Sequence, residues 1–95
     1  MKLVSVVKSP KPGKKYRATF DNDGRLKHTD FGAAGMDDYL HTKDKDQRER
    51  YRTRHKKDLD TNDPTKAGFL SYYLLWGDST SLQTNLSAYR HRFHL

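Results

Sequence analysis

Two histidines and three carboxylates within 14 residues have side-chain types that support metal chemistry: His28, Asp30, Asp37, Asp38 and His41. Imidazole nitrogens and carboxylate oxygens commonly bind zinc and other divalent metals. However, His28 and Asp30 are two positions apart on a predicted strand, and the other three follow a turn without a recognised ligand spacing. Short polar side chains at strand ends usually bind nearby backbone groups instead.

No other grouping of residues suggests catalysis. The chain has no cysteine, which excludes disulfides, thiolate metal sites and a cysteine nucleophile. No serine lies in a triad-like context. The sequence therefore predicts no catalytic residue, no metal, no cofactor and no small-molecule substrate.

A strongly basic segment is the second candidate for function. Between Lys43 and Lys57, eight side chains are basic and three are acidic. Such a helix has little apolar surface with which to pack against a core. It must therefore be held in place by the apolar segments on either side of it or by an acidic partner. Two interpretations stay open: a solvated face with internal ion pairs, or a docking face. The predicted binding residues of this segment are Arg48, Arg50, Tyr51, Arg52, Arg54, Lys56 and Lys57.

Basic residues also surround an aromatic residue near the N-terminus. Lys14, Lys15 and Arg17 flank Tyr16, and Tyr51 lies among the arginines of the basic segment. Exposed rings between cations are typical of proteins that bind single-stranded nucleic acid, because bases stack on them. The alternative is that both rings belong to the core. No RNA-recognition, zinc-finger or basic-zipper motif is present.

The charge balance favours an anionic partner. The net charge is +7, with 16 basic and 10 acidic side chains in residues 1–60 against 3 and 2 in residues 61–95. Nucleic acid, an acidic protein face or a charged lipid surface would fit this excess. The longest apolar run, Phe69–Trp76, is far too short to span a membrane. These features predict a soluble intracellular protein.

The periodicity predicts an α+β fold with one domain over residues 1–95. Residues 1–35 form an N-terminal three-stranded antiparallel meander, with strands at Leu3–Lys8, Lys15–Phe20 and Arg25–Phe31. The stretch Gly32–Gly35 reads as a compact turn whose small residues let the backbone pass close to the sheet edge. No GK[ST] sequence follows, which argues against a phosphate-binding loop.

Residues 36–95 are predicted to contain about three helices, after one helical turn at Asp37–Leu40. In the basic helix, Asp44 is the predicted N-cap with Gln47 at N3, and a narrow inward stripe is formed every fourth residue by Tyr51, His55 and Leu59. A helix starting at Pro64 with Asp63 as N-cap ends at Gly77, and a last helix over about Thr80–Phe93 is capped by Asp78 or Ser79. The predicted core contains Val4, Val6, Tyr16, Phe20, Phe31, Met36, Phe69, Leu70, Tyr73, Leu74, Trp76, Leu82, Leu86, Tyr89 and Phe93.

Several sequence blocks resemble a known group of proteins. The strings GRLKHTDFGAAGMDDY, RYRTRHKKDL and DPTKAGFLSYYLLWG, with the closing Leu/Tyr/Phe helix, are similar to a family of small uncharacterised basic proteins encoded by nucleocytoplasmic large DNA viruses. The resemblance runs from about Tyr16 to Phe93 and brings no catalytic residues. It implies a viral origin.

We therefore expect a non-enzymatic structural component of the virion. It would be a minor capsid or assembly protein that bridges larger acidic virion proteins through the basic helix. It would reside in the virion, and in the host cytoplasm or nucleus during assembly. The alternative is a nucleic-acid-binding protein that packages DNA or acts like a chromatin protein.

Overall fold

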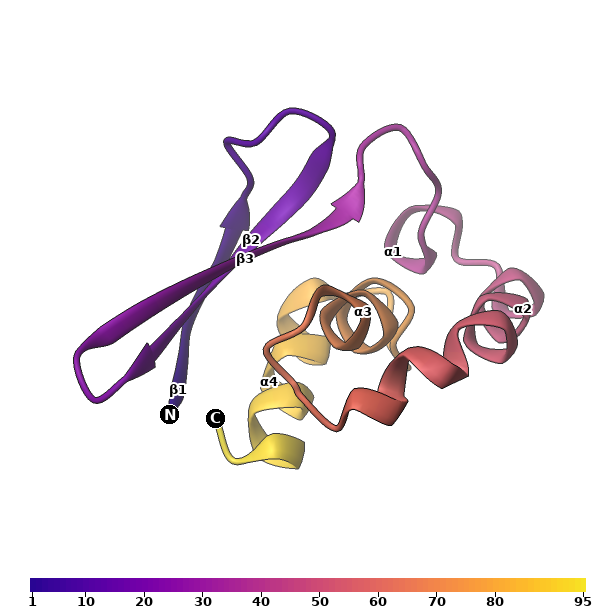
Figure 1. The fold of residues 1–95 in the computed structure, drawn as a ribbon. Helices are drawn as coiled ribbons and strands as arrows, with labels where there is room; N and C mark the ends of the chain where they lie inside the picture. The colour runs from indigo at the N-terminus through magenta and orange to yellow at the C-terminus, as the bar shows by residue number, and fades with distance from the viewer.

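A three-stranded antiparallel sheet forms the N-terminal part of the molecule, and helices follow it on one side (Figure 1). The computed structural model describes residues 1–95. The strands are β1 (Lys2–Lys8), β2 (Lys14–Asn22) and β3 (Arg25–Ala33), in the spatial order β1-β2-β3. The predicted α+β class and meander are confirmed.

A bulge in β1 decides which of its residues enter the core. Leu3 pairs with Phe20 and Ser5 pairs with Thr19, so Val4 has no partner in the ladder. A bulge adds one residue to the strand and reverses the alternation beyond it. Leu3 is consequently buried, whereas Val4 is 53% exposed. The prediction that Val4 lies in the core was wrong for this reason.

The third strand is longer than predicted. Gly32 and Ala33 belong to β3 and not to the following turn. Gly32 has φ +79, and a Cβ added there would lie 2.8 Å from the Leu75 side chain. The close approach predicted for this segment therefore exists, but it is to a helical turn and not to the sheet edge. Met36, predicted to point inward after this turn, is 66% exposed.

Six helical elements follow, of which two α-helices are single turns. Their bounds are α1 Tyr39–Thr42, α2 Lys45–His55, the 3₁₀ segment η1 Lys56–Thr61, α3 Ala67–Leu70, the π-helical segment η2 Ser71–Leu75, and α4 Leu82–Phe93. None of them is long and apolar enough to cross a membrane. α3 and η2 contact β3, whereas α2 lies beside α1 and η1, away from the sheet (Figure 1).

The helix starts were predicted correctly in one case of three. The Asp44 side chain accepts from the backbone N–H groups of Asp46 and Gln47 at 2.9 and 3.1 Å, as expected of an N-cap. Asp63 instead accepts from both the N–H and the hydroxyl of Thr65, closing a turn, so that the next helix begins only at Ala67.

The start of the last helix also differs from the prediction. Its N-cap is Ser81, which accepts from Thr84, and not Asp78 or Ser79. The Asp78 carboxylate is bound by Arg52, and the N–H of Ser79 donates to Asn85 at 3.0 Å. Both predicted caps are thus held in the preceding loop.

The core lies between the sheet and the helices α3, η2 and α4. Its buried apolar residues are Leu3, Ala18, Phe20, Phe31, Tyr39, Phe69, Leu70, Leu74, Leu75, Trp76, Leu86 and Tyr89. The predicted residues Val6, Tyr16, Tyr73, Leu82 and Phe93 are partly buried against this cluster. Apart from Val4 and Met36, every residue predicted for the core is therefore in it or packed against it.

The C-terminus is fastened to the bulged end of β1. The Leu3 N–H donates to the Leu95 carbonyl at 3.2 Å, and the Arg90 guanidinium donates to the carbonyls of Leu3 and Val4 at 3.0 and 3.3 Å. Figure 1 shows the two ends of the chain side by side. These bonds satisfy backbone groups that the edge strand leaves without a sheet partner.

Candidate functional site: the basic helix and the cleft beside it

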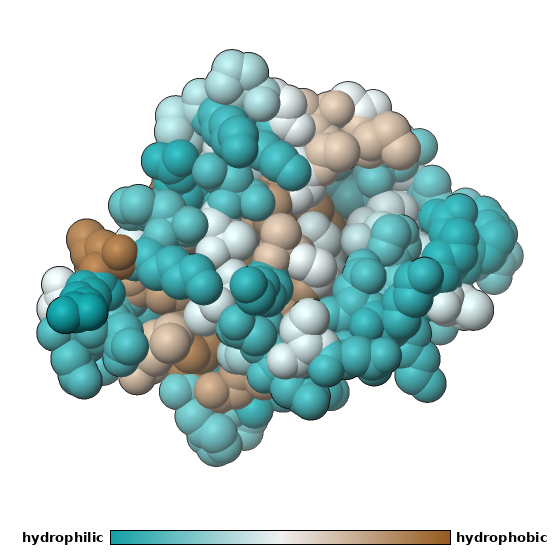
Figure 2. Space-filling model, viewed as in Figure 1, coloured by the Kyte–Doolittle hydropathy of each residue, from teal (hydrophilic) through white to brown (hydrophobic).

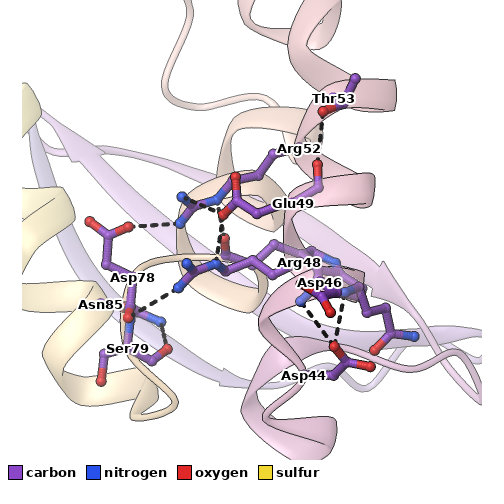
Figure 3. Close-up of polar contacts among 11 residues, drawn as sticks. Asp44, Asp46, Arg48, Glu49, Arg52, Thr53, Asp78, Ser79 and Asn85 are labelled. Atoms are coloured by element: carbon purple, nitrogen blue, oxygen red, sulfur yellow. Dashed lines mark hydrogen bonds and ion pairs between the residues drawn. The ribbon is translucent and has the colours of Figure 1, made fainter.

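Two arginines of α2 are directed at the body of the protein (Figure 3). Arg52 donates from Nε to the Trp76 carbonyl at 2.8 Å and from a terminal nitrogen to Asp78 at 2.9 Å. The Arg48 guanidinium lies 4.7 Å from the centroid of the Tyr39 ring. Arg48 also donates to its neighbour Glu49 at 3.0 Å. The charge-assisted bonds of Arg52 are stronger than neutral ones and attach α2 to the loop after η2, whereas the Arg48 contact with Tyr39 attaches it to α1.

An aromatic stack attaches the same helix further along. The Tyr51 ring lies between Trp76, at 4.4 Å with an 8° interplanar angle, and His55, at 4.1 Å and 22°. Burial raises the pKa of Tyr51. Tyr51 and Leu59 pack against the core and His55 is half-buried, so the predicted inward stripe is confirmed. Both faces of the Tyr51 ring are covered within the chain.

The other cations predicted to bind a partner form what we call the outer basic face: Arg50, Arg54, Lys56 and Lys57. All four are exposed, and none makes a hydrogen bond or ion pair within the chain. Figure 2 shows hydrophilic residues covering the side of the molecule where α2 lies. The site predicted from sequence is therefore divided between residues that attach the helix and residues that face solvent.

The basic residues of β2 are mostly used inside the molecule. The Lys15 ammonium lies 2.6 Å from the Asp38 carboxylate, and Arg17 binds Asp30 through two nitrogens at 2.9 and 3.1 Å. The Arg17 guanidinium, with help from the Ser9 hydroxyl, lowers the pKa of Asp30 to about 2. Lys14 remains exposed without a partner. Only one of the three predicted cations here is thus free to bind a ligand.

The histidines and carboxylates considered for metal binding are dispersed. Asp38 is buried and binds both Lys15 and His41; burial alone would raise its pKa, but these hydrogen bonds hold that pKa below the usual value. His28 lies within 2.9 Å of Thr19 on the outer face of the sheet. No group of three or more histidine, aspartate or glutamate side chains lies close enough to hold a metal ion.

A cleft that the sequence did not predict lies beside α2. It has a volume of about 450 Å³ and is bounded by the end of β3 and the turn after it, by α2 and by η2. We call it the α2 cleft. The principal side chains around it are Lys15, Met36, Asp37, Gln47, Tyr51, Arg54, His55, Leu75 and Trp76. The Gln47 side-chain oxygen is buried there without a hydrogen-bond partner.

Comparison with known proteins places the chain in a family whose function is unknown. A family model described as "Family of unknown function (DUF5754)" matches residues 4–55, more than half of the chain. The matched region contains the sheet from Val4 onward, α1 and α2. No curated protein and no solved structure matches the chain. The chain therefore belongs to the DUF5754 family.

Proposed function

We propose that the protein is a non-enzymatic structural component of a virus particle, a minor capsid or assembly protein that bridges larger acidic proteins. The outer basic face is the contact surface. The resemblance of its sequence blocks to proteins of large DNA viruses supports the setting, and the geometry of α2 supports the mode of binding.

One observation carries the proposal: the outer basic face has no partner within the chain although α2 itself is firmly attached. Arg52 attaches the helix by a charge-assisted hydrogen bond, Arg48 by its cation–π contact with Tyr39, and Tyr51 by stacking. Arg50 and Arg54, one turn apart, are left exposed. Cations held on a rigid element lose less freedom when they bind than cations on a mobile loop.

The composition of this region also fits a protein interface. Arginine and tyrosine are enriched in interfaces and in the residues that dominate their binding energy. Acidic side chains on the partner would complement the outer basic face and speed association at low salt. Lys14, exposed near the β1–β2 turn, adds a second contact for a partner that bridges two surfaces.

Nucleic-acid binding is the second candidate function, as in a DNA-packaging or chromatin-like protein. The observation that favours it is the net charge of +7, most of which lies in the first two thirds of the chain. Phosphate groups would satisfy the same outer basic face. An exposed basic face without a partner fits phosphate groups and acidic side chains equally, so the two candidates must be separated by experiment.

The decisive variant is Arg50→Glu combined with Arg54→Glu. Neither arginine has a partner within the chain, and their reversal lowers the net positive charge, so the fold should stay intact or become slightly more stable. Binding of the virion partner is lost. A control with the same change in charge is Arg25→Glu combined with Lys66→Glu, which alters exposed, unpaired cations outside α2. If the test variant unfolds, or if both variants weaken binding equally, the outer basic face is not the contact surface.

Two further measurements separate the candidates. Affinity for duplex DNA that falls steeply with salt, with a slope close to the number of phosphates contacted, supports nucleic-acid binding. Weak DNA affinity that barely depends on salt rejects it. Absence of the protein from purified particles rejects the structural role.

A further inference from the structure

We propose that the α2 cleft is a binding site for a nucleotide-like group, a planar heteroaromatic ring with N–H donors and an attached anion. This inference goes beyond the proposed function. The cleft shares Arg54 with the outer basic face, but its other lining residues, Gln47 and the aromatic stack among them, lie outside that face. The ligand is bound and not transformed.

The size of the cleft suits such a ligand. Its volume of about 450 Å³ falls within the range of about 300–1,000 Å³ typical of small-molecule sites. Four segments of the chain converge on it, represented by Lys15, Asp37, Gln47 and Leu75. Sites of this kind join apolar walls to a few polar groups that fix orientation.

Aromatic rings form one wall. Trp76, Tyr51 and His55 line the cleft as a continuous stack with near-parallel planes. His55 ends the stack, and its side chain is 41% exposed. A heteroaromatic ring gains affinity by stacking on exposed aromatic side chains. Met36, which is 66% exposed at the rim, supplies a flexible thioether that adapts to an inserted ring.

Two acceptors lack donors. The side-chain oxygen of Gln47 is buried and makes no hydrogen bond, although the residue lies in the first turn of a well-capped helix. A buried acceptor of this kind costs stability until a donor reaches it. The carboxylate of Asp37 also lines the cleft without a partner. The N–H groups of a nucleobase such as guanine would pair with the exposed Asp37 carboxylate, and with Gln47 once its amide rotates the buried oxygen toward the cleft.

One cation is available for the anionic group. Arg54 lines the cleft, is exposed and has no partner in the chain. Lys15 also lines the cleft, but Asp38 and the Met36 carbonyl occupy its ammonium. The guanidinium is suited to phosphate because its fork of donors matches two phosphate oxygens.

The test uses the fluorescence of Trp76, the only tryptophan of the chain. The probes are guanosine 5′-monophosphate, ribose 5-phosphate, and a guanosine-containing single-stranded octamer. We expect guanosine monophosphate to quench the fluorescence saturably, with a Kd of roughly 10 µM to 1 mM for a ligand of this size. Ribose 5-phosphate, which lacks the ring, should bind at least about tenfold more weakly. The tighter of the monophosphate and the octamer identifies the source of the nucleotide.

Gln47→Leu is the sharpest variant. It removes the unsatisfied acceptor, so the unliganded protein stays folded and its Tm is unchanged or raised. We expect affinity for the nucleotide to fall about five-fold or more. Arg54→Gln should weaken binding by a similar factor. Arg50→Gln, one turn away and outside the cleft, is the matched control and should leave binding unchanged.

Three results would overturn the inference. The first is no saturable quenching by guanosine monophosphate up to about 10 mM, above which affinity is too weak for a specific site. The second is equal affinity for ribose 5-phosphate, and the third is an equal loss of nucleotide affinity in Arg50→Gln and Gln47→Leu. The proposed function can fail separately. The proposed function depends on Arg50, which does not line the cleft. Nucleotide binding depends on Gln47, which is not part of the outer basic face.

Discussion

Replacing Arg52 with methionine should destabilise the protein far more than the same change at Arg50, two residues earlier in the same helix. Methionine keeps most of the length and packing of the arginine stem and removes the charged head. Arg52 is 21% exposed and donates to the Trp76 carbonyl and to Asp78. Arg50 is exposed and donates to nothing.

The expected cost follows from these contacts. Trp76 is 6% exposed, so its carbonyl loses a charge-assisted bond in a region with little water, at about 1.5–3 kcal/mol. Asp78 is 94% exposed, so its ion pair with Arg52 adds only about 0.2–1 kcal/mol. The free energy of unfolding should therefore fall by about 2–4 kcal/mol. Since about 1 kcal/mol shifts Tm by roughly 4–8 °C in a domain of this size, we expect a drop of roughly 8–32 °C.

Thermal and urea unfolding, followed by circular dichroism and Trp76 fluorescence, measure this effect. Arg50→Met should change Tm by no more than about 2 °C, because it only relieves repulsion with Arg54. Asp78→Asn should cost much less than Arg52→Met, which assigns most of the loss to the Trp76 carbonyl. Equal shifts for Arg52→Met and Arg50→Met would refute the division of α2 into attaching and outward-facing arginines.

Three further perturbations test other parts of the structure. Because the pKa of Asp30 is lowered to about 2, its ion pair with Arg17 stabilises the protein fully above about pH 4, and this stabilisation is lost as the pH falls toward 2. The Tm difference between the wild type and Asp30→Asn should therefore narrow between about pH 4 and pH 2. In a chemical-denaturation series, Gly32→Ala should lower the free energy of unfolding by about 2 kcal/mol or more, because the added methyl group suffers a left-handed backbone and also meets the Leu75 side chain of η2. Gly13→Ala, at φ +85 but in open space, should lower it by only about 1–2 kcal/mol. Asn85→Ala should cost roughly 2–4 kcal/mol in the same series, since its buried amide makes two hydrogen bonds to Ser79 in the loop before α4 and one to the Leu74 carbonyl in η2. A loss below about 1 kcal/mol would show that water replaces these bonds.

Local patterns in the sequence were sufficient to predict the sheet and most of the core. Alternation in β2 identified Phe20 as inward-facing, because a strand has a period of two. Asp44 was recognised as an N-cap because its side chain satisfies N–H groups only two and three residues away. The amphipathic spacing of Leu86 and Tyr89 identified the buried side of α4. Each of these depends on residues close together in the chain.

Features set by distant residues could not be predicted in this way. The bulge at Val4 depends on how β1 pairs with β2, and Asp63 closes a turn where its pattern with Pro64 favoured a helix. The same applies to the candidate site. Nothing in the sequence indicates that Arg52 meets the Trp76 carbonyl while Arg50 stays free. The α2 cleft was missed altogether, because its walls come from four segments that only the fold brings together.

The fastening of the C-terminus to β1 affects how copies of the protein meet one another. β1 is an edge strand, and edge strands invite pairing with a strand of another molecule. At one end of this edge, the backbone groups of Leu3 and Val4 are already occupied by Leu95 and Arg90. An antiparallel pairing of two β1 strands centred on Ser5 would also place Lys2 opposite Lys8, and like charges across strands repel. The β1 edge of the sheet is therefore protected against pairing with the β1 strand of a second copy, even when many copies are crowded together.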